Sequence, residues 1–210
     1  MKVALYGATG KSGSRILTEL VSRGHEVTVI VRDPSKLLNP GPGVVVKQDD
    51  LTNPEKIAEA INGADATISA YAPPQDDPDK IVEVTQRQVD AIKLAGHSRL
   101  LVVGGAGGLN VAPGVTLIDS GFLPDAYQPI AKAHVKALNV LRASPIDWTY
   151  LAPAAYFTPG ERTGKFRLGT DELIADEQHE SRISMEDYAI ALVDELEAPK
   201  HRRERFAVGY

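Results

Sequence analysis

The sequence contains no cysteine, only one tryptophan and no long apolar run. The lack of cysteine excludes disulfide bonds, thiol catalysis and cysteine-ligated metals, and we expect no metal site. No apolar stretch approaches the roughly 20 residues that a membrane-spanning helix needs, so we expect no membrane partner. Positive charge is also scarce, because 23 lysines and arginines stand against 28 acidic residues. The formal net charge of −5 argues against a nucleic-acid partner, which would require a basic face.

The remaining composition is that of an ordinary globular protein, with 43% hydrophobic and 24% charged residues. A length of 210 residues predicts a single domain, residues 1–210, that is large enough for a real core. The sequence starts directly with a strand pattern, which leaves no room for a signal peptide. We therefore expect a cytoplasmic protein, and the sequence leaves open whether it is a monomer or a dimer.

Strand and helix patterns alternate along most of the chain. Predicted strands cover residues 2–6, 25–31, 44–47, 65–70, 99–103, 148–151 and 205–208. Predicted helices begin near residue 11 and cover residues 55–61, 80–94, 130–142 and 185–197. This βαβ repetition predicts an α/β protein with a Rossmann-like, doubly wound parallel sheet and helices on both faces.

Two of these helices have N-cap signals. Asn53 precedes Pro54 at the start of one helix. Ser184 precedes the last helix, and Asp187 three residues later predicts an approximate capping box.

Two irregular regions interrupt the alternation, at residues 104–129 and 153–180, and a small hairpin is predicted at 163–175. Both regions follow the carboxyl ends of predicted strands, where open α/β sheets bind ligands. We therefore expect a small carboxyl-terminal region that covers the substrate.

The stretch LYGATGKSGS, residues 5–14, connects the first strand to the first helix. Gly7 permits a tight turn, Gly10 lets backbone amides approach a pyrophosphate, and Gly13 allows the helix to pack closely on the strand. This order indicates a dinucleotide site, with a purely structural turn as the alternative.

The same stretch ends like a P-loop, in Gly10-Lys11-Ser12. A P-loop needs another glycine five positions earlier, where this chain has Leu5 inside the strand pattern. Asp49 and Asp50, which follow the third strand, keep the triphosphate alternative open as magnesium ligands.

The end of the second strand reads Val31-Arg32-Asp33, at the position that contacts the adenosine ribose in dinucleotide sites. An arginine there accommodates the 2′-phosphate, so Arg32, with Lys36 nearby, favours NADP(H). An acidic residue accepts hydrogen bonds from the ribose hydroxyls, so Asp33 keeps NAD(H) possible. A solvated surface arginine is the structural alternative for Arg32.

Five segments together resemble the atypical short-chain dehydrogenase/reductase superfamily, and within it the compact NAD(P)H-flavin reductases of the flavin/biliverdin reductase B type, which are NmrA-like. They are MKVALYGATGKSGSRILTELVSRGHEVTVIVRD, LLVVGGAGGL, DWTYLAPAAYF, GERTGKFRLG and RISMEDYAIALVDELE, so the resemblance covers nearly the whole chain. It implies a Rossmann-like fold and hydride transfer from NAD(P)H to FMN or another flavin.

The resemblance also implies which residues bind the cofactor. For the pyrophosphate loop these are Gly7, Thr9, Gly10, Lys11, Ser12 and Gly13; for the 2′-phosphate Arg32; beside the adenine Asp50 and Leu51; on the ribose and nicotinamide side Ser69, Ala70 and Tyr71; under the nicotinamide Gly104 and Gly105; and at its carboxamide end Pro153, Ala154 and Tyr156. A turn role for Asp50 and packing roles for Tyr71 and Tyr156 remain alternatives.

The chain departs from the wider superfamily at the proton relay, which combines a serine with Tyr-x-x-x-Lys. The fifth strand runs into Gly104-Gly105 without a serine, and the lysine after Tyr127 is Lys132, one position too late. One residue is about 100° of helix rotation, so the pair is out of register. Tyr127 and His134 remain the catalytic candidates, although a lone histidine is often structural.

A flavin needs no such relay, because hydride passes directly to its ring and solvent supplies the proton. The sequence therefore predicts a flat small-molecule acceptor and an enzyme that reduces a flavin or quinone. The alternative is a regulator that binds NADP(H) to sense redox state without turnover. A sugar-nucleotide epimerase would need a larger carboxyl-terminal domain than residues 152–210 provide.

Overall fold

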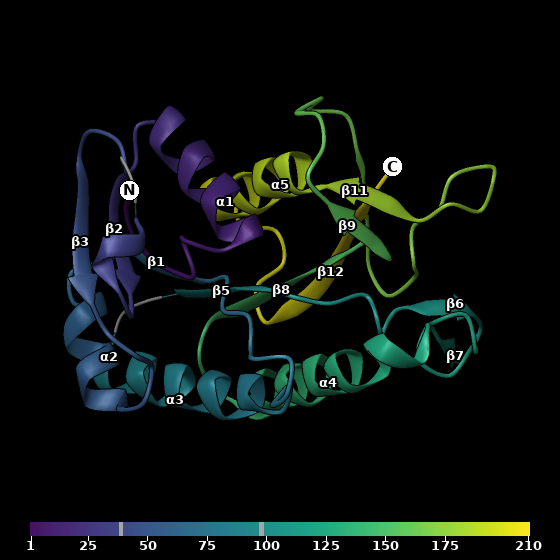
Figure 1. Cartoon of the computed structure of the whole chain (residues 1–210), viewed down its shortest axis with the longest axis horizontal. Helices are drawn as coiled ribbons and strands as arrows, with labels where there is room; N and C mark the ends of the chain where they lie inside the picture. Colours follow the sequence, from purple (N-terminus) through teal and green to yellow (C-terminus); the bar gives the residue numbers. More distant parts are fainter. Residues whose placement is uncertain (38–39, 97–98) are drawn as a thin grey trace.

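The computed structural model describes residues 1–37, 40–96 and 99–210. Its centre is an eight-stranded sheet with the order β10-β12-β8-β5-β4-β1-β2-β3 (Figure 1). Every neighbouring pair is parallel except β10 with β12. The predicted doubly wound, Rossmann-like sheet is therefore confirmed. The strands of this sheet are β1 (Lys2–Tyr6), β2 (Glu26–Val31), β3 (Val44–Gln48), β4 (Ala66–Ser69), β5 (Arg99–Val103), β8 (Trp148–Pro153), β10 (Arg167–Gly169) and β12 (Glu204–Gly209).

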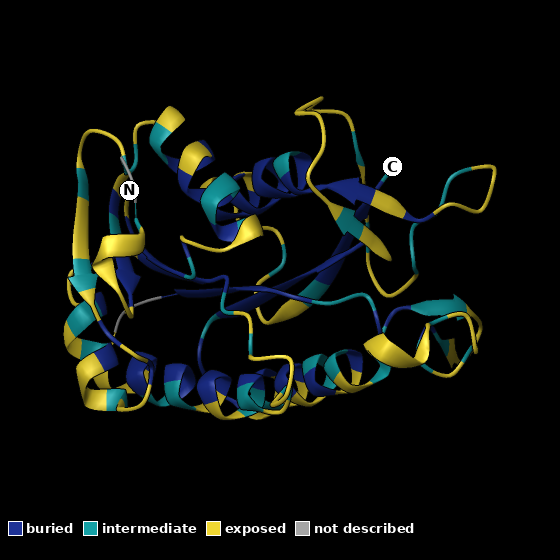
Figure 2. Cartoon of the chain, in the orientation of Figure 1, coloured by how far each residue is buried: buried dark blue, intermediate teal, exposed yellow. Residues whose placement is uncertain are grey.

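Helices cover both faces of the sheet, as predicted. On one face α1 (Lys11–Ser22) packs against α5 (Met185–Glu197) (Figure 1). On the other face lie α2 (Pro54–Ile61), α3 (Lys80–Ala95) and α4 (Gln128–Ala143). The sides of the helices that face the sheet are buried and their outer sides are exposed (Figure 2). Ile16 and Leu20 of α1 are fully buried, and each such side chain stabilises the fold by about 1.5–3 kcal/mol.

The predicted N-caps are present, but the capping box is only half right. Asn53 Oδ1 accepts a hydrogen bond from the Lys56 amide at 3.0 Å, and Ser184 Oγ accepts one from the Asp187 amide at 3.0 Å. The Asp187 carboxylate does not bond back to the Ser184 amide, which instead donates to Tyr210 Oη at 3.2 Å. A partner from the end of the chain has replaced the local one.

The predicted hairpin at residues 163–175 is wrong. Its first half forms β10, which pairs antiparallel with β12, so that Leu168 lies opposite Val208. The reason is long-range: β12 would otherwise expose an unpaired strand edge, and β10 covers it.

Both irregular regions contain short regular elements. Residues 104–129 hold the antiparallel pair β6 (Asn110–Ala112) and β7 (Val115–Thr116), followed by the 3-10 helix η2 (Asp125–Tyr127). The second region begins with β9 (Tyr156–Thr158), which pairs in parallel with β11 (Arg182–Ser184).

The strand order reverses between β1 and β4, which places a topological switch point at the carboxyl ends of these two strands. Open α/β sheets bind ligands at such a point. Among the residues that the structure describes, no helix is both long enough and apolar enough to cross a membrane.

Candidate dinucleotide site

The loop after β1 is built around two glycines that tolerate no side chain. Gly7 has a φ of +82°, and a Cβ there would lie 2.2 Å from the Ala70 carbonyl oxygen. A Cβ on Gly13 would lie 2.0 Å from the Gly7 carbonyl oxygen, so α1 can approach β1 only because residue 13 is glycine. The Gly10 amide donates to the Gly7 carbonyl at 2.9 Å and closes the turn. The loop is thereby held against the end of β4.

The amino terminus of α1 is open. Its N-cap is Gly10, which offers no capping side chain, and the first turn contains no acidic residue. The exposed Thr9 and Lys11 and the half-buried Ser12 make no side-chain hydrogen bond to a described residue. The first amides of a helix have no partner inside it and carry partial positive charge, so this end is suited to an anion such as a diphosphate.

At the end of β2 the side chains of Arg32 and Asp33 have different surroundings. Asp33 accepts hydrogen bonds from the Ser35 hydroxyl at 2.6 Å and the Ser35 amide at 3.1 Å, and these bonds lower the pKa of its carboxyl. Arg32 is exposed and lies near Tyr71: partial burial raises the pKa of Tyr71, and the charge of Arg32 acts against this rise. Asp33 is therefore engaged locally, whereas the exposed side chain of Arg32 forms no hydrogen bond with a described residue.

After β3 the chain makes a strained turn at Leu51, which has a φ of +62°. The buried Asp49 accepts from the Leu51 amide at 2.8 Å, and burial raises the pKa of Asp49. The exposed Asp50 accepts from the Thr52 hydroxyl and amide at 2.6 and 3.1 Å. Both carboxylates hold the turn, which is the structural alternative for Asp50 and leaves no pair of free magnesium ligands for a triphosphate site.

The centre of the sheet ends in a small-residue floor. Ser69 and Ala70 are buried at the end of β4, and Gly104 follows β5. A Cβ on Gly104 would lie 2.3 Å from the Tyr150 ring and 2.7 Å from the Leu151 carbonyl oxygen. The packing of β8 thus leaves no room at residue 104 for the side chain of the usual relay serine.

Beneath this floor lies a chain of polar atoms that the sequence did not reveal. The Gly105 amide donates to Tyr150 Oη at 2.8 Å, and Tyr150 Oη lies 3.3 Å from His134 Nδ1. Burial lowers the pKa of His134 to about 4, so its imidazole is neutral at pH 7. Burial raises the pKa of Tyr150, which keeps its phenol protonated. His134 was a candidate from the sequence, whereas nothing in the sequence singled out its partner Tyr150.

The other catalytic candidate lies at the surface. Tyr127 ends η2, its side chain is 61% exposed, and its hydroxyl bonds to no described residue. Tyr156 is 69% exposed in β9, while Pro153 and Ala154 are buried where β8 ends. The structure places the exposed tyrosines in the two irregular regions that border the floor.

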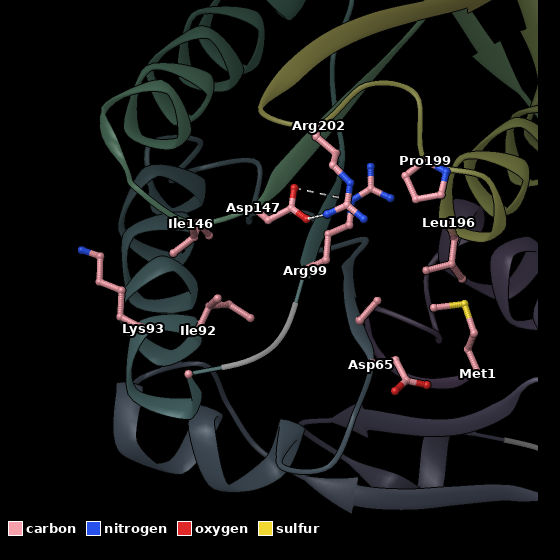
Figure 3. Close-up of a pocket in the computed structure, with 12 residues that line it drawn as sticks. Met1, Asp65, Ile92, Lys93, Arg99, Ile146, Asp147, Leu196, Pro199 and Arg202 are labelled. Atoms are coloured by element: carbon pink, nitrogen blue, oxygen red, sulfur yellow. Dashed lines mark hydrogen bonds and ion pairs between the residues drawn. The ribbon is translucent and has the colours of Figure 1, made fainter.

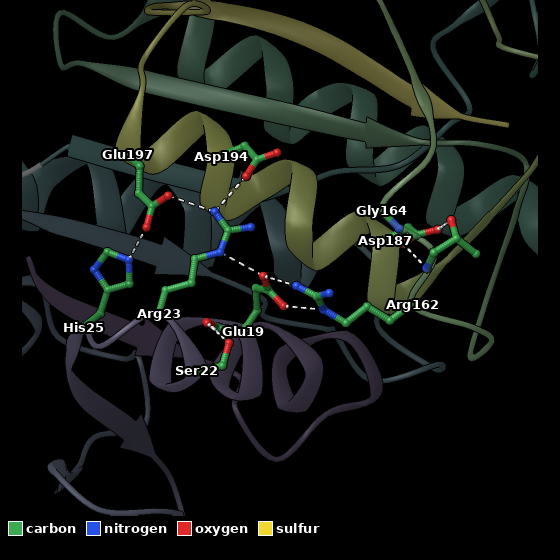
Figure 4. Close-up of polar contacts among 10 residues, drawn as sticks. Glu19, Ser22, Arg23, His25, Arg162, Gly164, Asp187, Asp194 and Glu197 are labelled. Atoms are coloured by element: carbon green, nitrogen blue, oxygen red, sulfur yellow. Dashed lines mark hydrogen bonds and ion pairs between the residues drawn. The ribbon is translucent and has the colours of Figure 1, made fainter.

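A loop from the second irregular region is tied to α1 and α5 (Figure 4). Arg162 forms hydrogen bonds with the buried Glu19 of α1 at 2.9 and 3.0 Å, and Arg23 bonds to the same carboxylate at 2.8 Å. The hydrogen bond from Arg162 is the main reason that the pKa of Glu19 is lowered. A glutamate between the apolar Ile16 and Leu20 was the one signal of this contact in the sequence.

A hollow in the surface lies away from these residues (Figure 3). It has a volume of about 600 Å³ and is lined by Met1, Asp65, Arg99 and Asp147, which lie at the amino ends of strands. Its charges are already paired within the protein, because Arg99 bonds to Glu195 at 2.6 Å and Asp147 bonds to Arg202. The hollow is therefore distinct from the dinucleotide site at the carboxyl ends. In the described part of the chain no cluster of residues could hold a metal ion.

Comparison with known proteins agrees with this geometry. A family model described as NAD(P)H-binding matches residues 7–199. The structure of a Burkholderia pseudomallei protein proposed to be exported is 47% identical, covers 100% of both chains and has a TM-score of 0.91. A proposed epimerase from Bacteroides thetaiotaomicron is 45% identical, with a TM-score of 0.94 over 100% of this chain and 96% of that one. A Streptococcus pneumoniae protein proposed as an NADH-flavin reductase is 36% identical, with a TM-score of 0.89 over 100% and 99%.

These three structures share the fold of this chain but have different proposed activities, so the similarity supports the fold and does not identify the second substrate. The glycine loop, the open end of α1 and the family match agree on that cofactor. The chain belongs to the NAD(P)H-binding family and has the Rossmann-like fold of an atypical, NmrA-like short-chain dehydrogenase/reductase.

Proposed function

We propose that this protein is an NADPH-dependent reductase that passes hydride directly to a flat acceptor, such as free FMN, another flavin or a quinone. The observation that carries the proposal is Gly104, where the packing of Tyr150 excludes any side chain. The usual relay serine has no room there, yet the elements that bind the cofactor are present. The similarity to a proposed NADH-flavin reductase supports the same acceptor class.

The chain contributes binding and orientation. The amides at the start of α1 would hold the diphosphate, and Arg32 would contact the 2′-phosphate, which favours NADPH. Gly104 and Gly105 would lie under the nicotinamide, with Pro153 and Ala154 beside it. When bound, NADPH supplies the hydride, which carries both electrons, and solvent supplies the proton that completes the reduced acceptor.

The acceptor would lie above this floor, between the two irregular regions. Phe122 and Tyr127 in the first region and Tyr156 in the second are 79%, 61% and 69% exposed. Exposed apolar side chains of this kind can cover a planar ring and exclude water. Because orientation is the main contribution, no single side chain should be indispensable.

The test is NADPH oxidation by the purified protein with FMN, riboflavin or a quinone. We expect turnover with at least one acceptor, and Tyr127→Phe should lower it by less than about tenfold. Loss of a true general acid would lower the rate by roughly 10²–10⁴-fold. Such a collapse would restore a conventional carbonyl reductase mechanism.

Tight NADPH binding without turnover would favour the regulatory alternative. Conversion of a sugar nucleotide without net NADPH oxidation would favour an epimerase. The cytoplasmic location also remains a prediction, which fractionation of the native cell would check.

A further inference from the structure

The pair formed by Tyr150 and His134 determines which nitrogen of the imidazole carries the proton. Tyr150 Oη accepts from the Gly105 amide at 2.8 Å and has one proton of its own to donate. His134 Nδ1, at 3.3 Å, is the only acceptor within hydrogen-bond distance among the described residues. The phenol therefore donates to Nδ1, and since the imidazole is neutral, its proton must be on Nε2.

The protonated Nε2 forms no hydrogen bond with a described residue. It is also absent from the buried polar atoms that lack a partner, so part of its surface is exposed. Solvent or a ligand can therefore reach it. The ring lies against Gly105, because a Cβ on that glycine would be 3.0 Å from His134 Cγ and 3.2 Å from Cδ2. Nε2 is bonded to Cδ2, so the free N–H lies one bond away from an atom that borders Gly105.

We propose that Tyr150 is a positioning residue that holds His134 as an Nε2–H donor, and that this donor selects flat acceptors with a carbonyl oxygen on the reducible ring. The proposal rests on the proposed function for its second half. The donor would bind the acceptor oxygen without transferring its proton. Flavins and quinones share such an oxygen, whereas a cationic dye such as methylene blue lacks one.

The first half is tested without any ligand, by ¹⁵N NMR of protein labelled at histidine. The His134 signals, assigned by their loss in His134→Gln, should report an unprotonated Nδ1 and a protonated Nε2. This state should persist at pH values well below the ordinary histidine pKa, because burial lowers the pKa to about 4. In Tyr150→Phe the two tautomers should mix, while the signals of the other histidines stay unchanged as a check of folding. A protonated Nδ1 in the wild type, or no change in Tyr150→Phe, would overturn the assignment.

The second half is tested by steady-state kinetics with FMN, a quinone and methylene blue. Tyr150→Phe and His134→Ala should each raise the KM for FMN and the quinone about 2- to 10-fold, the effect of one neutral hydrogen bond. The Kd for NADPH and the KM for methylene blue should change less than the KM for FMN and the quinone. His134→Gln, whose amide nitrogen reaches the Nε2 position, should restore the KM to within about twofold.

The two possible failures give different results. Equal losses with all three acceptors, or no rescue by His134→Gln, would overturn the selection of acceptors while NADPH turnover continues. Absence of turnover with every acceptor would overturn both the proposed function and the selection of acceptors by His134. The NMR test of the His134 tautomer does not depend on that outcome.

Discussion

Helices α1 and α5 lie side by side on one face of the sheet, yet their amino termini are chemically opposite (Figure 1). At α5 the Ser184 side chain caps the helix, and Glu186 and Asp187 place negative charge in the first turn. At α1 the cap is Gly10, without a side-chain bond, and the first turn has no acid. One end is satisfied by the protein itself, and the other is open to an anion.

The acids of α5 are themselves occupied by the loop at residues 160–164. The Thr163 and Gly164 amides each donate to Asp187 Oδ1 at 2.8 Å (Figure 4), and the Gly160 amide donates to Glu186 at 2.8 Å. The same physical feature, a helix amino terminus, thus anchors a loop in α5 and remains available in α1. What differs is the charge and size of a few side chains, and the following substitutions test that difference.

The largest effect should come from giving α1 the charge of α5 through Ser12→Asp. The new carboxylate would lie beside the diphosphate, and like charges placed together cost several kcal/mol, so the Kd for NADPH should rise at least about 100-fold. Stability should not fall, because an acid in the first turn stabilises a helix by about 0.3–1 kcal/mol.

Ser12→Asn is the matched control, with the same shape and no charge. A fluorescence titration with NADPH and urea unfolding would measure both quantities. Equal binding by the Asp and Asn variants would mean that no diphosphate lies at this end of α1.

Arg32→Ala should weaken NADPH binding about 10- to 100-fold, because a hydrogen bond to a charged group contributes roughly 1.5–3 kcal/mol. NADH binding should hardly change, since Asp33 is already bonded to Ser35. Lys36→Ala, which removes a neighbouring charge, should have a smaller effect on NADPH. If Arg32→Ala weakens both cofactors equally, Arg32 does not contact the 2′-phosphate.

Local patterns predicted the open end of α1 better than the polar chain under the floor. The strand, the glycines and the helix are consecutive, and their pattern placed Gly7 and Gly10 correctly in the first βα turn and Gly13 in the first turn of α1. Tyr150 and Gly105 are 45 positions apart and meet only because β8 pairs with β5. The hairpin prediction failed for the same reason, because β10 found its partner at the end of the chain.

Asp187→Asn should reduce stability without affecting the cofactor. The carboxylate is fully buried and accepts from Thr163, Gly164 and Tyr210, so its loss should cost about 1.5–3 kcal/mol. Burial raises its pKa, but these hydrogen bonds outweigh burial and hold the pKa below the usual value. The contribution is therefore present above the unfolded pKa near 4 and is lost as the pH falls through the lower folded value.

Urea unfolding of wild type and Asp187→Asn at pH 7 and at progressively lower pH would test this. The two stability curves should converge in acid, while the Kd for NADPH at pH 7 stays within about twofold. A large loss of NADPH affinity at pH 7 would show that the two helix ends are not independent.

The smallest effect should come from Ser184→Ala, which removes the cap of α5. The hydroxyl accepts from the Asp187 amide at 3.0 Å and donates to the Glu161 carbonyl at 2.7 Å, and loss of such a cap costs about 0.5–2 kcal/mol. Ser14→Ala on α1 is the control, because its hydroxyl lies inside an open helix end and bonds to the exposed Lys11 carbonyl, so the change should stay within about 0.5 kcal/mol. The midpoints of urea unfolding, compared at a constant m-value, would measure both changes in the free energy of unfolding. If the two substitutions reduce stability equally, the Ser184 cap does not close the end of α5. The contrast with α1 would then rest on charge alone.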